Sequence, residues 1–582
     1  MIQSALKGLE IIIYRTLYVT IIKTIFHCIP DRDGSAIQFS VYFLTGFCNI
    51  CHADNNPLIR ESSRNPFSQD FAMQPVQQQT WTLPDDCQVR DLYDTLAEPF
   101  SLATGPETKV IRRWYDTFDW RLFRAGRILI RQGTEWILQD FDGRTLFTLG
   151  TGRKVCRFAS DFPASPLADE LKALVSVRAL LELGRSEIRA SRWYIVNDDE
   201  KRVALLDVEK LVNSGTGRSL ITLALTEVRG YSKWFKRIAG TILKFGGRPQ
   251  SGPADILSFV LEGSGRTPLD YSSGYNVPLE PDMASIEAAV RIHSVLLEAI
   301  RINEPGVLTD TDIEFLHDLR VAVRRTRSAL VLMKGVFAPA IEKQFKQEFK
   351  YIGQITGPVR DLDVYLASRE EYMQRVPFRL QTGLGYFFED LTTRRKTERR
   401  KLVRALKGER YQRILADWRQ LLATSPWPEP GKRGELPVKE LAGQVIHKRF
   451  RRVLADGEKI DPKSPDESLH RLRIECKKLR YSLEFFTSLY DEDVMRRLVR
   501  HLKLLQNNLG DFNDLSVQQD MLAHFLSTIR PGTIRSREMA ASIGGLMTDL
   551  SRQHREVRTR FEETFARFAR KKNLDLYTSL FA

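Results

Sequence analysis

The carboxyl-terminal half of this 582-residue chain is organised around the stretch His317–Arg327, HDLRVAVRRTR. It reappears as His470–Arg480, HRLRIECKKLR, at an offset of 153 residues. A second block keeps this offset, because Gly357-x-x-Arg360-Asp361 corresponds to Gly510-x-x-Asn513-Asp514. Two separate blocks with one offset indicate a duplicated unit. A unit of about 150 residues has room for about four long helices and predicts two fused helical bundles rather than a solenoid.

Both copies of the repeated segment have helical periodicity. At 100° per residue, apolar side chains form one stripe in each copy, which predicts the face that packs in the core. In the first copy this stripe holds Leu316, Leu319, Val323, Leu330 and Met333, and in the second Leu469, Leu472, Cys476, Leu479 and Leu483.

Cations lie on the flank beside each stripe, at His317, Arg320, Arg324 and Arg327 and at His470, Arg473, Lys477 and Arg480. Like charges on consecutive turns repel by some tenths of a kcal/mol per pair, so the arrangement favours an anionic partner. A solvated face with counter-ions is the alternative, and the repetition of the pattern weighs against it. Arginine suits phosphate because its planar guanidinium makes two parallel hydrogen bonds, and lysine adds charge. The two histidines can serve as phosphate donors or as capping groups. Asp361 and Asp514 are expected near helix ends, where they orient a cation or cap the helix.

The net charge is concentrated in the same half. Lysine and arginine total 88 against 73 acidic residues, a surplus of 15. Residues 283–582 hold 54 basic and 40 acidic residues, a surplus of 14. This asymmetry indicates a polyanionic partner, either nucleic acid, an anionic membrane or a phosphate polymer. A hydrophobic content of 42% excludes a mostly disordered chain, and six cysteines are too few for a disulfide framework.

The duplicated motif H-x-L-R-x-x-x-[RK]-[RK]-x-R, followed by G-x-x-[RN]-D-[LF], resembles the conserved-histidine α-helical domain, or CHAD, over about residues 283–582. The resemblance implies two four-helix bundles with pseudo-twofold symmetry and a basic surface that binds inorganic polyphosphate. It implies that residues of both repeats contact the polyphosphate. Lys350 and Lys503, which are also 153 residues apart, belong to this set. The second copy has Asn513 where the first has Arg360. The predicted polyphosphate-binding residues are His317, Arg320, Arg324, Arg325, Arg327, Lys350, Arg360, His470, Arg473, Lys477, Lys478, Arg480 and Lys503.

The preceding region has short apolar runs that predict strands at 127–130, 135–138 and 202–206, with helices at Pro166–Ser186 and Ser232–Lys244. Tyr115–Gly126 resembles the Y-D-T-x-D-x-x-L-x-x-x-G stretch of the CYTH family, the triphosphate tunnel enzymes, and Val228–Lys233 resembles the closing turn of that family. The resemblance implies a tunnel of antiparallel strands. Active members carry an E-x-E-x-K metal motif, which is missing from this sequence; cations remain at Arg113, Arg121, Arg124 and Arg131. We therefore expect a degenerate domain without phosphoryl transfer, since metal-binding carboxylates are its main source of charge neutralisation.

The amino terminus is expected to be an appended extension. Its apolar stretch at 11–29 is interrupted by Arg15 and Lys23, which disfavours a membrane span. Cys48-x-x-Cys51-His52 has the pattern that attaches c-type haem. The pattern is short, and no convincing export signal accompanies it, so we expect no haem or zinc there.

The sequence thus predicts an α+β multidomain protein. An antiparallel β tunnel or barrel-like CYTH-like domain at 78–245 follows an extension at 1–77, and a linker at 246–282 leads to an all-α CHAD domain at 283–582, with repeats at about 283–424 and 438–575. We expect a cytoplasmic, non-enzymatic protein that binds inorganic polyphosphate, that can associate with polyphosphate granules and that needs no cofactor. We expect no specific nucleic-acid partner and no membrane partner, and protein partners stay open. The rival functions are a metal-dependent triphosphatase and a nucleic-acid binder, although the basic faces lack interleaved aromatics for base stacking.

Overall fold

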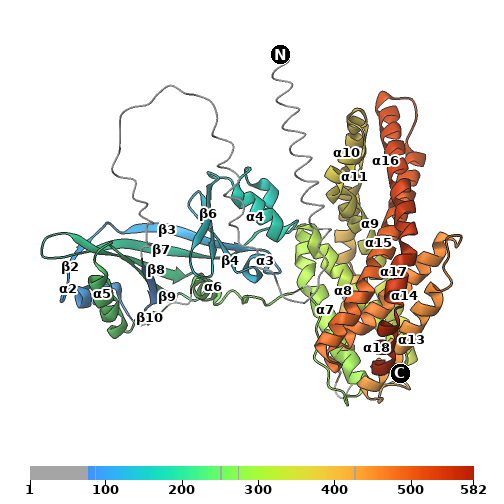
Figure 1. The fold of residues 1–582 in the computed structure, drawn as a ribbon, viewed down its shortest axis with the longest axis horizontal. Helices are drawn as coiled ribbons and strands as arrows, with labels where there is room; N and C mark the ends of the chain where they lie inside the picture. Colours follow the sequence, from blue (N-terminus) through green and yellow to red (C-terminus); the bar gives the residue numbers. More distant parts are fainter. Residues whose placement is uncertain (1–76, 85–86, 250–251, 273, 425–427, 582) are drawn as a thin grey trace, which may run out of the picture. The chain divides into compact units, whose positions relative to one another are not determined.

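The computed structural model describes residues 77–581 apart from 85–86, 250–251, 273 and 425–427. The predicted extension, with its C-x-x-C-H pattern, lies outside the described residues. Residues 76–582 form one compact unit. Within it, an antiparallel sheet region is followed by a helical region (Figure 1), as the sequence predicted.

The sheet region contains a ten-stranded sheet in the described part of the chain, in the order β10-β1-β9-β8-β7-β3-β4-β5-β6, with β2 paired to β7. Its long central strands are β7 and β8 (Figure 1). Gly133, in the two-residue turn between β4 and β5, has a φ of +59°, which glycine adopts without a Cβ penalty. The strands are β1 (Gln78–Thr82), β2 (Ser101–Thr104), β3 (Thr108–Asp116), β4 (Arg127–Gln132), β5 (Glu135–Asp140), β6 (Thr145–Gly150), β7 (Leu181–Val196), β8 (Arg202–Asn213), β9 (Ser219–Glu227) and β10 (Arg248–Pro249).

Helices cover the sheet on both faces, because successive side chains of a strand alternate between the faces. In β4, Leu129 packs with residues of α4 (Pro166–Val175), whereas Ile128 and Ile130 pack with those of α6 (Pro253–Leu261). α2 (Val89–Ala97) and α5 (Ser232–Lys244) share a third core with Trp81 of β1 and neighbouring strands. The short α3 (Arg121–Arg124) joins the core of α4 through Leu122.

The structure differs from the expectations for this region in three places. The sheet is open rather than closed into a tunnel or barrel, because no described pairing connects the edge strands β10 and β6. The helix expected at Pro166–Ser186 ends at Val175, where Ser176 takes a φ of +54°, and β7 begins at Leu181. The segment expected as a linker supplies β10 and α6, and α6 packs on the sheet.

The helical region repeats its order of elements. The 153-residue offset carries α8 onto α14 at both ends, and it carries the start of α7 onto the start of α13. The first repeat contains α7 (Ser285–Thr309), α8 (Ile313–Leu332), α9 (Pro339–Ala367), α10 (Arg369–Arg375), α11 (Phe378–Leu406) and α12 (Glu409–Leu422). The second contains α13 (Val438–Gly457), α14 (Asp466–Phe485), α15 (Glu492–Thr528), α16 (Ile534–Thr559), α17 (Phe561–Phe568) and α18 (Lys571–Phe581).

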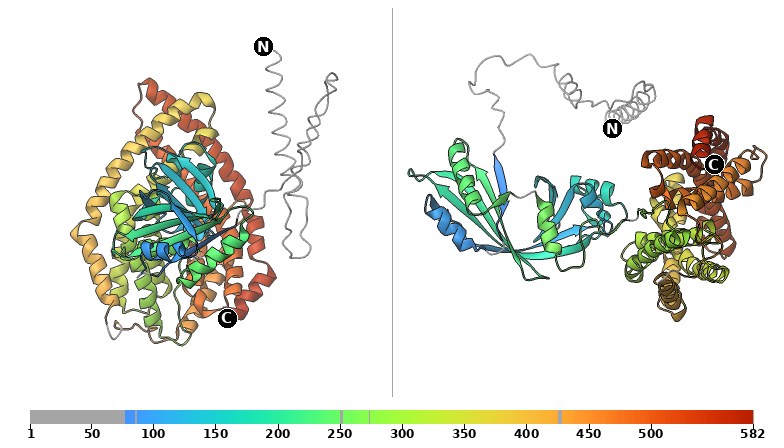
Figure 2. Two further views of the ribbon diagram at one scale, coloured as in Figure 1. Left: turned by 90° about the vertical axis from the view of Figure 1, so that its left-hand side faces the viewer. Right: turned by 90° about the horizontal axis from the view of Figure 1, so that it is seen from below.

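The two repeats share one contiguous core rather than packing as two separate ones. α8 contacts α14, and α11 contacts α16, so two pairs of equivalent elements join the repeats (Figures 1 and 2). Every residue of the predicted apolar stripes is buried. On the basic flank of α8, Arg324 and Arg325 contact α14.

Candidate functional site

The basic faces of the two repeats meet in one hollow of about 380 Å³. Arg324 of α8 donates from Nε to Tyr481 Oη of α14 at 2.6 Å, and Arg325 lies 3.2 Å from Glu484 of the same helix. These contacts hold α8 and α14 together and place cations of both repeats around one space. The lining includes His317, Arg324 and Arg325 from α8, Arg473, Lys477, Arg480, Tyr481 and Glu484 from α14, and Gln506, Asn507 and Gly510 from α15.

Positive charge in this hollow is only partly neutralised. Glu484 pairs with Arg325 and with Arg480, and Arg473 lies 3.4 Å from Asp514. In the part of the chain that the structure describes, neither Arg324 nor Lys477 has a carboxylate within 4.0 Å. Burial, followed by the positive charges of Arg473 and Arg324, lowers the pKa of Lys477 to about 8. A bound anion would relieve this repulsion.

His317 is held in its neutral form. Burial, followed by the charge of Arg360, lowers its pKa to about 4. At neutral pH its ring can donate one N–H group but carries no charge. In the second repeat His470 Nδ1 is 3.1 Å from Oδ1 of Asn513, which stands where the first repeat has Arg360. The substitution of arginine by asparagine therefore changes the partner of the histidine.

Several predicted residues lie outside this hollow. Arg320 donates from Nη1 to the carbonyl of Gly353 and to Thr356 Oγ1, both at 3.0 Å, and so is directed at α9. The motif glycine Gly357 lies beside this guanidinium, since a Cβ there would be in ordinary contact with Arg320 Nη1 at 3.5 Å. Arg327 also lies against α9, beside Gly353.

Arg360 donates to the carbonyl of Ile313, and Lys478 pairs with Glu475 at 2.6 Å. Lys350 and Lys503 are exposed and do not line the hollow. The structure thus brings together His317, Arg324, Arg325, Arg473, Lys477 and Arg480, and places the other predicted cations on neighbouring surfaces or in ion pairs. Asp361 and Asp514 lie within α9 and α15 rather than near helix ends.

Sequence reasoning missed Tyr481, Gln506, Asn507 and, in the sheet region, Arg178, which line the same hollow. Arg121 also lines it, although the sequence placed this residue only among the cations of the CYTH-like domain. Tyr481 follows the repeated motif directly, which was a usable signal. The contributions of Arg121 and Arg178 depend on long-range packing, which no local pattern predicts.

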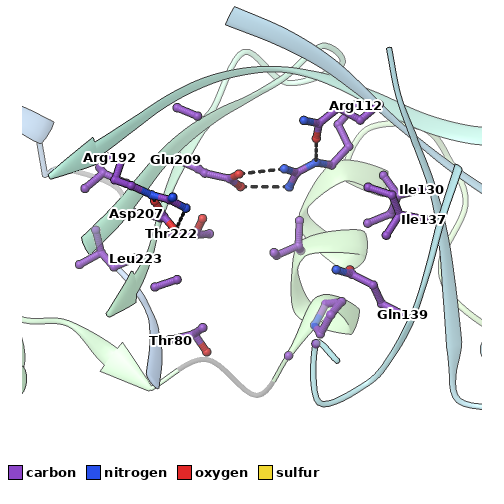
Figure 3. Close-up of a pocket in the computed structure, with 18 of the residues that line it drawn as sticks. Thr80, Arg112, Ile130, Ile137, Gln139, Arg192, Asp207, Glu209, Thr222 and Leu223 are labelled. Atoms are coloured by element: carbon purple, nitrogen blue, oxygen red, sulfur yellow. Dashed lines mark hydrogen bonds and ion pairs between the residues drawn. The ribbon is translucent and has the colours of Figure 1, made fainter. Parts of the chain in front are cut away.

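A second hollow, of about 550 Å³, lies on the sheet (Figure 3). Asp207 and Glu209 project from the same face of β8, and each is held by an arginine. Arg112 makes two hydrogen bonds to Glu209, at 2.8 and 3.0 Å, and Arg192 makes two to Asp207, at 2.6 and 2.9 Å. Among the described residues no group of three or more histidine, cysteine or acidic side chains is arranged to hold a metal ion.

The comparisons with known proteins bear on the helical region. Residues 292–523 match the family model of the CHAD domain. The helical region thus contains a CHAD domain, as the duplicated motif predicted. No described helix is long and apolar enough to cross a bilayer.

Two uncharacterized proteins from strains of Mycobacterium tuberculosis are 22% identical over 304 residues, which are 52% of this chain and 56% of theirs. The chain therefore spans about half the length of these curated relatives. The solved CHAD domain from the plant Ricinus communis is 27% identical and covers 51% of this chain and 95% of its own, with a TM-score of 0.43. PptA from Streptomyces chartreusis is 13% identical and covers 49% of this chain and 99% of its own, with a TM-score of 0.39. A Hippeastrum protein described as a putative adenylyl cyclase with dominant triphosphatase activity is 12% identical and covers 34% of this chain and 99% of its own, with a TM-score of 0.23.

Proposed function

We propose that this protein binds inorganic polyphosphate in the hollow between α8 and α14. CHAD domains are known to bind polyphosphate, and the helical region contains such a domain. The carrying observation is that cations of both repeats line one hollow, where Arg324 and Lys477 have no carboxylate partner among the described residues. A polymer suits this surface better than a single phosphate does, because Arg327, exposed on α8 after Arg324, continues the cationic row outside the hollow.

Nucleic acid fits the hollow less well. Its lining aromatic residue, Tyr481, is buried and accepts a hydrogen bond from Arg324, so it offers no free ring for base stacking. The lining instead offers guanidinium and ammonium groups, which suit phosphate oxygens.

The test is a competition experiment on the full chain, with labelled polyphosphate displaced by unlabelled polyphosphate, RNA or DNA. Hydrogen bonds to charged groups contribute about 1.5–3 kcal/mol each, so Arg324→Gln with Lys477→Gln should weaken polyphosphate binding by about 100-fold or more. The matched control, Arg90→Gln with Lys201→Gln, removes the same charges at exposed positions of the sheet region and should bind as the wild type does. Displacement by DNA at equal phosphate concentration, or equal binding by both double variants, would refute the proposal.

We also propose that the sheet region does not hydrolyse triphosphates. Asp207 and Glu209, the adjacent carboxylates of its hollow, are each neutralised by a two-bond contact with an arginine. A metal ion would have to compete with these guanidinium groups for the same oxygens.

A further inference from the structure

A buried ion-pair cluster connects the sheet region to the helix that carries the first basic face. Arg178, in the turn between α4 and β7, is fully buried. Its Nη1 lies 3.2 Å from Asp312 Oδ1 and its Nη2 lies 2.5 Å from Asp318 Oδ2. The backbone N–H of Ala179 donates to Asp312 at 3.0 Å. Arg178 Nε also lies 3.5 Å from Asp119 Oδ1 of the sheet region, so the guanidinium is shared among three carboxylates. Two of these, Asp312 at the N-cap and Asp318, belong to the start of α8.

One of the two carboxylates of α8, Asp318, lies beside the proposed ligand. Asp318 follows His317 directly, and both Asp318 and Arg178 line the hollow that holds Arg324 and Lys477. Asp318 also accepts a hydrogen bond from Tyr271 at 3.2 Å. Without Arg178, α8 would present an unneutralised carboxylate to a polyanion in this hollow.

The second repeat lacks this feature. The 153-residue offset places Pro465 and Arg471 at the positions equivalent to Asp312 and Asp318. The two acids therefore occur in the first repeat, which contacts Arg178, and not at the equivalent positions of the second. Since acids at these positions oppose polyanion binding, their presence opposite a buried arginine is best explained by docking of the sheet region.

We propose that the sheet region is an integral part of the polyanion site, in which Arg178 acts as a positioning residue that pairs with Asp312 and Asp318 and so offsets the negative charge that α8 places at the wall of the hollow. This inference rests on the proposed function. It assigns the sheet region a role in polyphosphate affinity that requires neither catalysis nor contact between Arg178 and the ligand. Docking of the sheet region on α8 and binding of polyphosphate in the hollow are then coupled, so that each stabilises the other.

The test uses the full chain and measures polyphosphate affinity. Arg178→Met leaves the two acids unneutralised and should weaken binding by about tenfold or more, given the strength of charge interactions at low dielectric. Arg178→Met with Asp312→Asn and Asp318→Asn should restore it, because asparagine keeps the helix cap and removes both charges. Arg90→Met, an equal loss of charge at an exposed site, is the matched control and should have no effect.

A second comparison covers the case in which Arg178→Met does not fold, since removing one partner of a buried ion pair leaves a buried charge unpaired and destabilises the protein. The double variant Arg178→Met with Asp312→Asn differs from the triple variant only in the carboxylate of Asp318. The triple variant should bind about tenfold more tightly, by the same charge argument. Equal affinities of the two, or wild-type affinity of a folded Arg178→Met, would overturn this inference alone. Loss of the proposed function itself would appear as an inability of the wild type to bind polyphosphate.

Discussion

Lys477 should make polyphosphate binding depend on pH between about 8 and 10. In the free protein its pKa is lowered to about 8 by burial and by Arg473 and Arg324. A phosphate group in the hollow favours the charged form and should return the pKa toward the ordinary value of about 10.4. Binding therefore takes up a proton in this window. His317, with a pKa of about 4, is neutral throughout it.

The size of the effect follows from the two pKa values. Affinity falls by at most about tenfold per pH unit between the free and the bound pKa, so it should be at most about 100-fold weaker at pH 10 than at pH 7. The ligand contributes little to this slope, because a phosphate monoester has already lost its second proton near pH 6. Partial solvent exposure of Lys477 makes the observed decline smaller than this limit.

Calorimetry at pH 9 in two buffers of different ionisation enthalpy measures the proton uptake directly, and it should approach one proton per complex. Lys477→Arg keeps the charge at every pH of the series because arginine does not deprotonate there, so its affinity should be nearly flat. Lys477→Gln should be weak and equally flat. A wild-type affinity that does not change from pH 7 to pH 10, or a Lys477→Arg variant that loses affinity as the wild type does, would refute the reasoning.

Three further predictions concern catalysis, the two repeats and stability. The full chain should release no phosphate from tripolyphosphate with Mg²⁺ or Mn²⁺ in a phosphate-release assay, and turnover that Asp207→Asn abolishes would contradict this. Because the cations of α8 and α14 line one hollow, Arg324→Glu and Arg473→Glu should each weaken even a short polyphosphate in a displacement assay; a short chain that tolerates either change would indicate two separate patches. Gly383→Val should lower the melting temperature by several degrees, since a Cβ there would lie 2.2 Å from the carbonyl oxygen of Glu538 where α11 crosses α16; an unchanged melting curve would show that this crossing can relax.

Periodicity predicted the local structure of the repeats well. α8 and α14 coincide under the repeat offset, and their apolar stripes are buried, because burial of one helical face is a property that spacing alone determines. Spacing does not determine which neighbour covers the flank. Arg320 and Arg324 are one turn apart, yet the first is directed at α9 and the second at α14.

In the sheet region too, local structure was predicted from the sequence and long-range packing was not. The strands at 127–130 and 135–138 and the helix at 232–244 were found from local patterns. Whether the sheet closes depends on pairing between its edge strands, which a run of alternating residues does not encode. The helix predicted to continue to Ser186 ends early because the chain turns at Ser176, and this turn delivers Arg178 to α8.

The meeting of α8 with α14 has a consequence for the direction of the ligand. Both helices contribute cations to the hollow, although among these only Arg324 and Lys477 occupy equivalent positions under the repeat offset. A linear polyphosphate has the same chemistry in both directions, whereas a nucleic-acid strand has chemically distinct ends. If polyphosphate binds in the hollow as proposed, its chain offers no chemical direction for the hollow to select. The two helices also differ in their acids. Asp312 and Asp318, which pair with Arg178, occur at α8 and have no acidic counterpart at α14.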